Sequence, residues 1–281
     1  MTRFVVGGST AVVTGAAGGI GYAVAHELSK RGARLVLLDR DADGLAAAAD
    51  RLHTARPTRP VTTYVVDLAD RAAALAVAQQ VRDGFPDIHL LVNNAGVALE
   101  GRLDQVSLED FEWVVDVNFR AVVTMTHTLL PNLQATPGAH IANLSSLFGI
   151  IAPGGQVAYS SSKFAVRGFG DALRQELAPH DVGVTTVHPG GIRTQISESA
   201  RVGNGVSSAE EKVAREMGRR LLTIDPAVAA TRIVDGVVRR KPRVLIGASA
   251  HALDAVARIA PGSYGRLLVA WDARLRQRIE T

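Results

Sequence analysis

The chain has 281 residues, of which 47% are apolar and 21% are charged, as is typical of a globular protein with a large buried core. It contains no cysteine, which excludes disulfide bonds, thiolate catalysis and cysteine-ligated zinc, and which favours a cytoplasmic location. The first residues lack a signal-peptide pattern, and every apolar stretch is too short to cross a bilayer, so we expect neither a secreted nor a transmembrane protein.

Short segments rich in β-branched residues alternate along the chain with longer segments that have a helical period. The expected strands are 10–14, 33–39, 61–66, 88–92, 140–145, 182–188 and 243–247. The expected helices are 18–31, 42–55, 70–84, 108–135, 156–178 and two or more within 207–239. This alternation predicts an α/β fold with a single doubly wound, seven-stranded parallel sheet and helices on both faces.

A glycine cluster, TGAAGGIG, lies where the first expected strand turns into the first expected helix. Gly15, Gly19 and Gly21 leave room for backbone N–H groups and the helix N-terminus to face a pyrophosphate. The spacing differs from GxGxxG, and glycines also serve simply to turn a strand into a helix. The cluster therefore indicates a dinucleotide site only together with its surroundings.

Asp39 supplies that context, because it ends the second expected strand 18 residues after Gly21. An acid at this distance meets the adenosine ribose hydroxyls of a bound dinucleotide and would repel a 2′-phosphate. Gly18, in front of Gly19, is neither lysine nor arginine, so NAD(H) is favoured over NADP(H). Arg40 is the counter-argument, because a guanidinium there could pair with a phosphate.

Tyr159 and Lys163 are four residues apart in the segment YSSSK, 13 residues after Ser146. Residues at this spacing share one face of a helix, so the ammonium group can lie beside the phenol and favour its ionised form. A phenol with an ordinary pKa near 10 is a poor base at neutral pH, and we expect Lys163 to lower that pKa into a working range. Taken together, these residues predict hydride-transfer chemistry.

Seven motifs in order make the chain similar to the short-chain dehydrogenase/reductase family, from about residue 9 to residue 247. They are TGAAGGIG, Asp67 in VVDL, NNAG at residues 93–96, Asn118 in DVNF, Ser146 in NLSS, YSSSK, and PGGIRT at residues 189–194. Any one of these motifs is common by chance, whereas seven in the same order are specific.

The resemblance implies a set of residues that bind the dinucleotide. Asp67 would hydrogen-bond the adenine, the NNAG segment would brace the sheet beside the cofactor, and Ile192 and Thr194 would hold the nicotinamide amide. The full predicted set is Gly15, Gly18, Gly19, Ile20, Gly21, Asp39, Arg40, Asp67, Leu68, Asn94, Ala95, Gly96, Tyr159, Lys163, Pro189, Gly190, Ile192 and Thr194.

The same resemblance implies four catalytic residues and no metal. Tyr159 would be the acid/base, Lys163 would also hold the nicotinamide ribose, and Ser146 would bind the substrate oxygen. Strand alternation favours Ser146 over Ser145. Asn118 would bind a water that links the lysine to solvent, or it would equally be an amide in the helix interior that satisfies a backbone group.

These expectations describe an NAD(P)-dependent oxidoreductase that acts on CH–OH groups and interconverts a secondary alcohol and a ketone. Apolar residues around Ser146 and Tyr159, among them Leu147, Phe148 and Ile151, favour a hydrophobic substrate. The alternatives are a 3-oxoacyl carrier-protein reductase and a non-catalytic regulatory protein that binds a dinucleotide. By resemblance, residues 195–222 form a lid over the substrate.

The catalytic domain is expected to span 1–247, followed by a basic amphipathic helical extension at 248–281. Residues 239–281 carry nine basic and three acidic side chains, while the whole chain has a net charge of +4. The extension has an apolar stripe at helical spacing, formed by Tyr264, Leu267, Leu268, Trp271, Leu275 and Ile279. Four arginines surround this stripe, namely Arg266, Arg274, Arg276 and Arg278. We expect the stripe to dock on the same domain. Sealing an interface between subunits is the second alternative, and contact with an acidic membrane surface is the third and is not favoured.

No DNA-binding motif accompanies the basic extension, so nucleic acid is not an expected partner. The expected partners are a small-molecule alcohol or ketone and further copies of the chain. By resemblance, the long helices at 108–135 and 156–178 would pair between subunits in a homodimer or homotetramer.

Overall fold

The computed structural model describes residues 3–55 and 61–280, without the side chains of 272, 273 and 275–280. The strands are β1 (Thr10–Thr14), β2 (Arg34–Asp39), β3 (Val61–Val65), β4 (Leu90–Asn93), β5 (Leu99–Glu100), β6 (His140–Leu144), β7 (Gly183–Pro189), β8 (Arg201–Val202) and β9 (Arg243–Ile246). The helices are α1 (Gly19–Lys30), α2 (Ala42–Ala55), α3 (Arg71–Gly84), α4 (Leu108–Val115), α5 (Ala121–Ala135), α6 (Val157–Leu177), α7 (Ser208–Leu221), α8 (Pro226–Val238), α9 (Ala248–Ile259) and α10 (Tyr264–Glu280).

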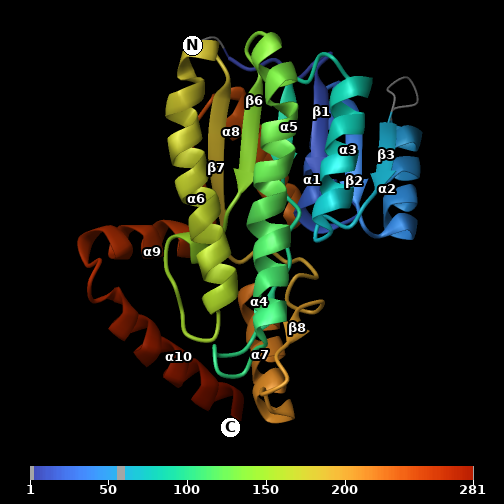
Figure 1. The fold of residues 1–281 in the computed structure, drawn as a ribbon. Coiled ribbons are helices and arrows are strands. Elements are labelled where there is room, and N and C mark those ends of the chain that lie inside the picture. The colour runs from blue at the N-terminus through green and yellow to red at the C-terminus, as the bar shows by residue number, and fades with distance from the viewer. Residues whose placement is uncertain (1–2, 56–60, 281) are drawn as a thin grey trace.

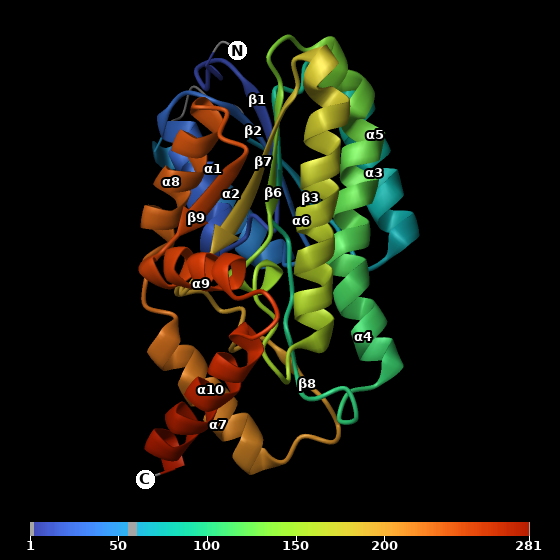
Figure 2. The ribbon, with the colours of Figure 1, turned by 90° about the vertical axis from the view of Figure 1, so that its left-hand side faces the viewer.

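Seven strands form one parallel sheet in the order β3-β2-β1-β4-β6-β7-β9, which confirms the predicted fold class. Helices α3, α5 and α6 cover one face, and α1, α2 and α8 cover the other (Figures 1 and 2). The central strands consist almost entirely of buried residues, as their unbroken apolar runs predict for a sheet covered on both faces.

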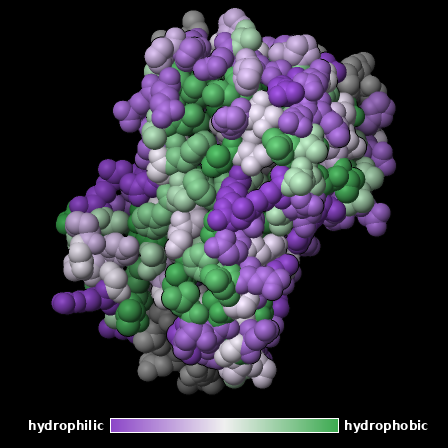
Figure 3. All heavy atoms as spheres, in the orientation of Figure 1, coloured by the Kyte–Doolittle hydropathy of each residue, from purple (hydrophilic) through white to green (hydrophobic). Residues whose placement is uncertain are grey.

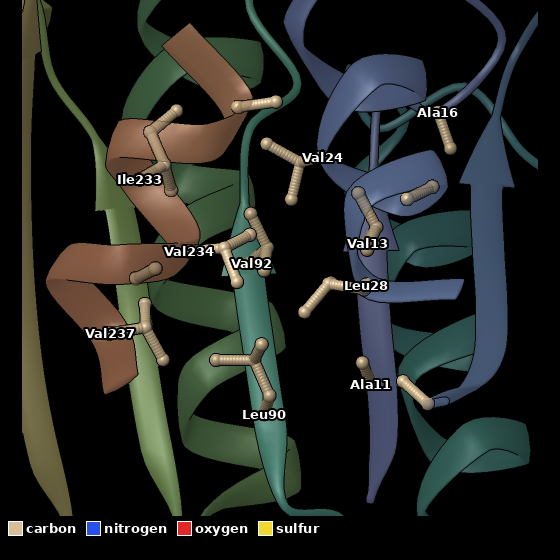
Figure 4. Close-up of a cluster of buried hydrophobic side chains, with 14 of the residues drawn as sticks. Ala11, Val13, Ala16, Val24, Leu28, Leu90, Val92, Ile233, Val234 and Val237 are labelled. Atoms are coloured by element: carbon tan, nitrogen blue, oxygen red, sulfur yellow. The ribbon is translucent and has the colours of Figure 1, made fainter. Parts of the chain in front are cut away.

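Two apolar layers hold the helices on the sheet. On one face, Val24 and Leu28 of α1 and Ile233 and Val237 of α8 converge on strand residues such as Val92, all fully or almost fully buried (Figure 4). On the other face, α3, α5 and α6 contribute a second buried cluster. Burying one leucine or isoleucine side chain stabilises a fold by about 1.5–3 kcal/mol, so these layers fix the ends of the strands firmly.

The chain runs outward from the middle of the sheet in two directions, because β1 and β4 are neighbours although β2 and β3 lie between them in sequence. Ligands of doubly wound sheets bind at such a switch point, outside the carboxyl ends of the strands. Helices α7 and α10 and the N-terminal end of α4 project beyond this same edge (Figures 1 and 2).

Most expected bounds differ from the observed ones by at most two residues, and three differences concern segments around the cleft. The expected helix at 108–135 is interrupted by a π-helical turn at Asp116–Arg120, which separates α4 from α5. The expected strand at 140–145 ends at Leu144. A second small sheet, formed by β5 and β8, was not predicted, because strands of two residues carry no periodic signal.

The C-terminal extension consists of α9 and α10. Leu268 of α10 is buried against Ile150 and Ile151, while Leu267 and Trp271 remain 60% and 51% exposed. The predicted positions Leu275, Arg276, Arg278 and Ile279 lie outside the described side chains. Within the described residues, no helix has both the length and the apolar character needed to span a bilayer.

Candidate active site

The glycine loop after β1 is shaped by close contacts that exclude side chains. Gly15 has a φ of +67°, and a Cβ at Gly21 would overlap the Gly15 carbonyl oxygen. Asn94 braces the loop, because its amide Nδ2 donates to the carbonyl oxygens of Thr14 at 2.9 Å and Gly15 at 3.1 Å. The loop and the NNAG segment therefore form one rigid unit at the switch point.

Helix α1 begins at Gly19 with its first N–H groups free of any side-chain cap. A Cβ at Gly18 would meet no atom within 4 Å, so open space faces this turn. Free N–H groups at a helix N-terminus attract anions. These residues fit the pyrophosphate of a dinucleotide on the geometry of the loop alone.

The carboxylate of Asp39 lies at the end of β2 beside this loop. Its Oδ2 accepts a hydrogen bond from the Ala17 N–H at 2.9 Å, and its Oδ1 accepts one from the Asp41 N–H at 3.1 Å. Arg40 is exposed and borders the same cleft. Asp67 and Leu68 border it from the end of β3, with the Asp67 carboxylate accepting from the Ala69 N–H at 2.9 Å.

The loop 189–194 closes the opposite side of the cleft. A Cβ at Gly19 would lie 3.3 Å from the methyl group of Thr194, so this loop and the glycine loop face each other. Ile192 is buried and pairs through its backbone with Ile224. Pro189 and Gly190 also line the cleft, at the end of β7.

Ser146, Tyr159 and Lys163 meet at the floor of the cleft, at the end of β6 and on the first turns of α6. Ser146 Oγ accepts from the Phe148 N–H at 3.1 Å, and the Ser146 hydroxyl lies close enough to the Tyr159 phenol to lower the pKa of that phenol. Lys163 is only 3% exposed, and its ammonium group donates to the Leu144 carbonyl at 3.1 Å and lies 5.7 Å from the centre of the Tyr159 ring.

The two adjacent serines point in different directions, as expected, although both lie just beyond the end of β6. Ser145 is buried, and its Oγ donates to the Lys163 carbonyl at 2.8 Å, which ties the end of β6 to α6. Ser146 instead faces Tyr159. His188, which the sequence analysis did not single out, contacts the backbone of Ser146: its ring nitrogen Nδ1 lies 3.0 Å from the Ser146 carbonyl oxygen. That oxygen can only accept, so Nδ1 carries the proton.

The pKa of the Tyr159 phenol differs from the expectation. Burial raises this pKa above its ordinary value, and the hydrogen bond with Ser146 is the opposing effect. Burial also lowers the pKa of Lys163 to about 8, so the amine remains mostly protonated at neutral pH but gives up its proton more readily than an exposed lysine. The protein's own groups therefore keep the phenol protonated, and the expected lowering of its pKa by Lys163 is not met.

Asn118 sits in the π-helical turn and is fully buried. Its Oδ1 accepts from the Val97 N–H at 2.8 Å, and its Nδ2 donates to the Val97 carbonyl at 3.0 Å and to Ser162 Oγ at 3.1 Å. Of the two alternatives considered from the sequence, the structure shows the amide satisfying backbone groups. Its Oδ1 and the Lys163 ammonium both lie close to Gly96, so the amide is next to the predicted site.

The cleft that joins these residues has a volume of about 2040 Å³. It runs from the glycine loop past Tyr159 to the segment 195–222 and the C-terminal extension. All predicted cofactor-binding residues line this cleft except Gly21. Of the four predicted catalytic residues, only Asn118 does not line it. Among the described residues, no group of three histidine or acidic side chains could hold a metal ion.

The segment 195–222 is attached to the body of the protein at several points. Strand β8 pairs with β5, and Glu210 at the start of α7 accepts from Arg102 at 3.1 Å and from Gln105 at 3.2 Å. The Arg201 guanidinium stacks 3.7 Å above the Trp113 ring. The segment thus has a fixed base near residues 99–113 and one helix, α7, over the cleft.

The chain matches the family model of the short chain dehydrogenases over residues 9–204, which is well over half of its length. The chain belongs to the short-chain dehydrogenase/reductase family of oxidoreductases. It is 45% identical over 269 residues to a protein of Mycobacterium tuberculosis named "Putative oxidoreductase SadH", covering 95% of this chain and 96% of that protein. The predicted resemblance is confirmed.

Two solved structures of short-chain dehydrogenases/reductases share the fold. One, from Burkholderia phymatum in complex with NAD, has a TM-score of 0.80 and 29% identity, and covers 92% of this chain and 94% of that one. The other, a metagenomic oxidoreductase in complex with NADP, has a TM-score of 0.70 and 29% identity, with 86% and 98% covered. Members of this family with similar folds therefore bind either dinucleotide.

Proposed function

We propose that this protein is an NAD(H)-dependent oxidoreductase that interconverts a secondary alcohol and a ketone. The observation that carries the proposal is the meeting of Ser146, Tyr159 and Lys163 at the floor of the cleft that also contains the glycine loop. A non-catalytic protein that only bound a dinucleotide would have no use for this group of side chains beside the nicotinamide end of the cleft.

In ketone reduction, the phenol of Tyr159 donates its proton to the carbonyl oxygen. The raised pKa of Tyr159 suits this direction, because the phenol is protonated at neutral pH. Ser146 holds the same oxygen by a hydrogen bond and stabilises the negative charge that develops there. The bound dinucleotide supplies or accepts the hydride at its nicotinamide ring.

In alcohol oxidation, Tyr159 accepts the proton from the hydroxyl group. Burial works against this direction, because it disfavours the phenolate. The positive charges available to offset burial are those of Lys163 and of the oxidised coenzyme. Lys163, next to Gly96 and Tyr159, is placed to hold the nicotinamide ribose as well. We therefore propose positioning of the coenzyme as the main role of Lys163.

A preference for NAD(H) over NADP(H) is proposed from Asp39. Its carboxylate is held in place by two backbone N–H groups at the rim of the adenine end, where it would hydrogen-bond ribose hydroxyls and repel a 2′-phosphate. Among the described residues, none forms a hydrogen bond or ion pair with the Arg40 guanidinium. Arg40 therefore remains the residue that would counteract this preference.

The proposal is tested by a screen of secondary alcohols and ketones, each with NAD(H) and with NADP(H), followed at the nicotinamide absorbance band. Turnover of at least one hydrophobic pair, with a higher kcat/KM for NAD(H), is the expected result. Dinucleotide binding without turnover of any substrate would favour the regulatory alternative instead. Turnover restricted to 3-oxoacyl thioesters would favour a carrier-protein reductase.

A further inference from the structure

Helix α7 has an apolar face with no interior partner. None of its 14 residues is buried, yet Ala214, Met217 and Leu221 line the cleft together with Gly218. The spacings of three, four and seven residues place them on one face of the helix. An amphipathic helix normally buries such a face against the core, so here the cleft takes the place of the core.

Helix α10 provides the wall that faces α7. Leu268 anchors it on the protein, whereas Val269 and Trp271 line the cleft and are 70% and 51% exposed. The two helices contact one another and lie beyond the carboxyl edge of the sheet (Figure 2). The space between them is therefore bordered by apolar side chains that are only partly covered by protein.

The apolar wall is continuous with the predicted catalytic residues. The Phe148 ring meets the Tyr159 ring edge-to-face with 6.1 Å between centroids. Leu147 and Phe148 belong to the same packed cluster as Leu268, and Leu253 of α9 completes it. An apolar group attached to the carbon that reacts at Tyr159 could thus contact apolar side chains continuously from the phenol to α10.

We propose that the substrate carries an extended alkyl chain, which lies between α7 and α10 while its secondary alcohol or ketone group reaches Tyr159. This inference rests on the proposed function and goes beyond it by naming the chain-binding residues Met217, Leu221, Leu268, Val269 and Trp271. A long-chain methyl ketone is the simplest member of this class. The chain covers the apolar faces of α7 and α10 that protein leaves open.

The first test is a series of methyl ketones from about four to ten carbons, each reduced with NADH. Each buried methylene group contributes roughly 0.8 kcal/mol, which would raise kcat/KM by up to about fourfold per carbon. We expect kcat/KM to rise steadily along the series. Turnover with a kcat/KM that stays flat or falls would overturn the inference and leave the proposed function intact, whereas no turnover of any ketone would contradict the proposed function.

The second test compares two substitutions on α10. Val269→Asn introduces a polar group into the cleft wall, and Leu267→Asn is its matched control, because Leu267 is also exposed but does not line the cleft. We expect Val269→Asn to lower kcat/KM for the ten-carbon ketone by about fivefold or more, with less than a twofold change for the four-carbon ketone. Two results together would overturn the inference: an equal effect of both variants on kcat/KM for the ten-carbon ketone, and co-sedimentation of the wild-type protein with anionic phosphatidylglycerol vesicles. They would indicate that α10 is a lipid-docking surface.

A third measurement does not depend on turnover. The chain has two tryptophans, so Trp113→Phe leaves Trp271 as the sole indole. We expect a ten-carbon secondary alcohol, added without coenzyme, to shift the Trp271 emission to shorter wavelength, because the chain removes water from the cleft. A four-carbon alcohol at the same concentration should have no effect. An emission that responds to neither alcohol would overturn the assignment of the cleft.

Discussion

Tyr159 and Lys163 show how far one side chain's chemistry depends on burial. The pKa of Tyr159 is raised and that of Lys163 is lowered to about 8, in both cases because burial disfavours the charged form. The spacing of the two residues is visible in the sequence, and so is their common helix face. The balance between burial and charge is not, because burial is created by segments far away in the chain.

Replacing Tyr159 by phenylalanine removes the proton carrier and leaves the ring in place. We expect Tyr159→Phe to lower kcat by at least a hundredfold, as for other general acid–base residues. The affinity for NADH, measured by fluorescence titration, should stay within about threefold, because the loss is confined to the proton transfer. Retention of more than a few per cent of the wild-type rate would contradict the role given to this phenol.

Asp39→Asn tests the coenzyme preference at a single atom. The amide oxygen can still accept from the Ala17 N–H, so the contact with the glycine loop should remain, whereas the bond from the exposed Asp41 N–H is lost. Removing the negative charge should raise kcat/KM for NADPH relative to NADH by roughly tenfold, about 1.4 kcal/mol. Arg40→Ala is the companion variant, and combining it with Asp39→Asn should lower the NADPH value again. A ratio unchanged by Asp39→Asn would count against the preference.

At the scale of elements, the glycine loop and α1 depend on the absence of side chains. A Cβ at Gly21 would overlap the Gly15 carbonyl and approach Asn94, whereas a Cβ at Gly18 would meet nothing within 4 Å. We expect Gly21→Ala to lower the free energy of unfolding by about 2 kcal/mol or more, through overpacking. Gly18→Ala, the matched control, changes only the N-cap of α1 and should lower it by less than about 1 kcal/mol. Similar unfolding curves for both variants would contradict the packing described here.

The elements that the sequence predicts well are those with a regular period or a clear end. The seven strands of the large sheet and the helices around them have such patterns, and the glycine cluster marks the start of α1. The π-helical turn around Asn118 has no such pattern, because it differs from an α-helix by only one residue in a single turn. Likewise, the amphipathic stripe of α10 predicts that one face packs, but not that it borders the cleft.

The segment 195–222 shows the same limit. Ser207 and Glu210 form a capping box at the start of α7, which a sequence pattern can reveal. The bonds from Arg102 and Gln105 to Glu210 join residues more than 100 positions apart. Such contacts follow from the path of the whole chain, and local sequence carries no signal for them.

For the whole molecule, two buried histidines should make stability depend on pH. Burial lowers the pKa of His140 to about 3 and that of His188 to about 4, so both are neutral in the folded protein at pH 5. The unfolded chain binds protons below its ordinary pKa of about 6.5, so stability falls as pH drops from that value towards 4. Each buried histidine should therefore lower the free energy of unfolding by about 2 kcal/mol at pH 5 relative to pH 8.

Urea unfolding at pH 5 and at pH 8 measures this difference. His140→Asn should reduce the loss of stability between the two pH values by about 2 kcal/mol, whatever its effect at pH 8. His53→Asn, at an exposed position, is the control and should leave the difference unchanged. A wild-type protein equally stable at both values would contradict the burial of neutral imidazoles.

We propose that the protein assembles through α4, α5 and α6. Apolar side chains gather over the lower ends of α4 and α6 on the face shown in Figure 3. Leu108 of α4 is 76% exposed, and Val157 and Phe164 of α6 are 41% and 36% exposed. Exposed apolar patches of this kind mark protein interfaces. Light scattering after size-exclusion chromatography should show a dimer or tetramer. The double variant Leu108→Asp, Phe164→Asp should be a monomer, whereas the control Val65→Asp should keep the wild-type assembly. A wild-type monomer at micromolar concentration would contradict this proposal.

The central claim is that hydride moves between a nicotinamide and a substrate carbon next to Tyr159. The most direct measurement uses NADH deuterated at the transferring position, a hydrophobic ketone and mass spectrometry of the alcohol formed. We expect one deuterium on the carbinol carbon with the wild-type protein and none above background with Tyr159→Phe. A wild-type protein that binds the coenzyme but forms no deuterated alcohol from any ketone tested, or a Tyr159→Phe variant that forms it equally fast, would contradict this mechanism.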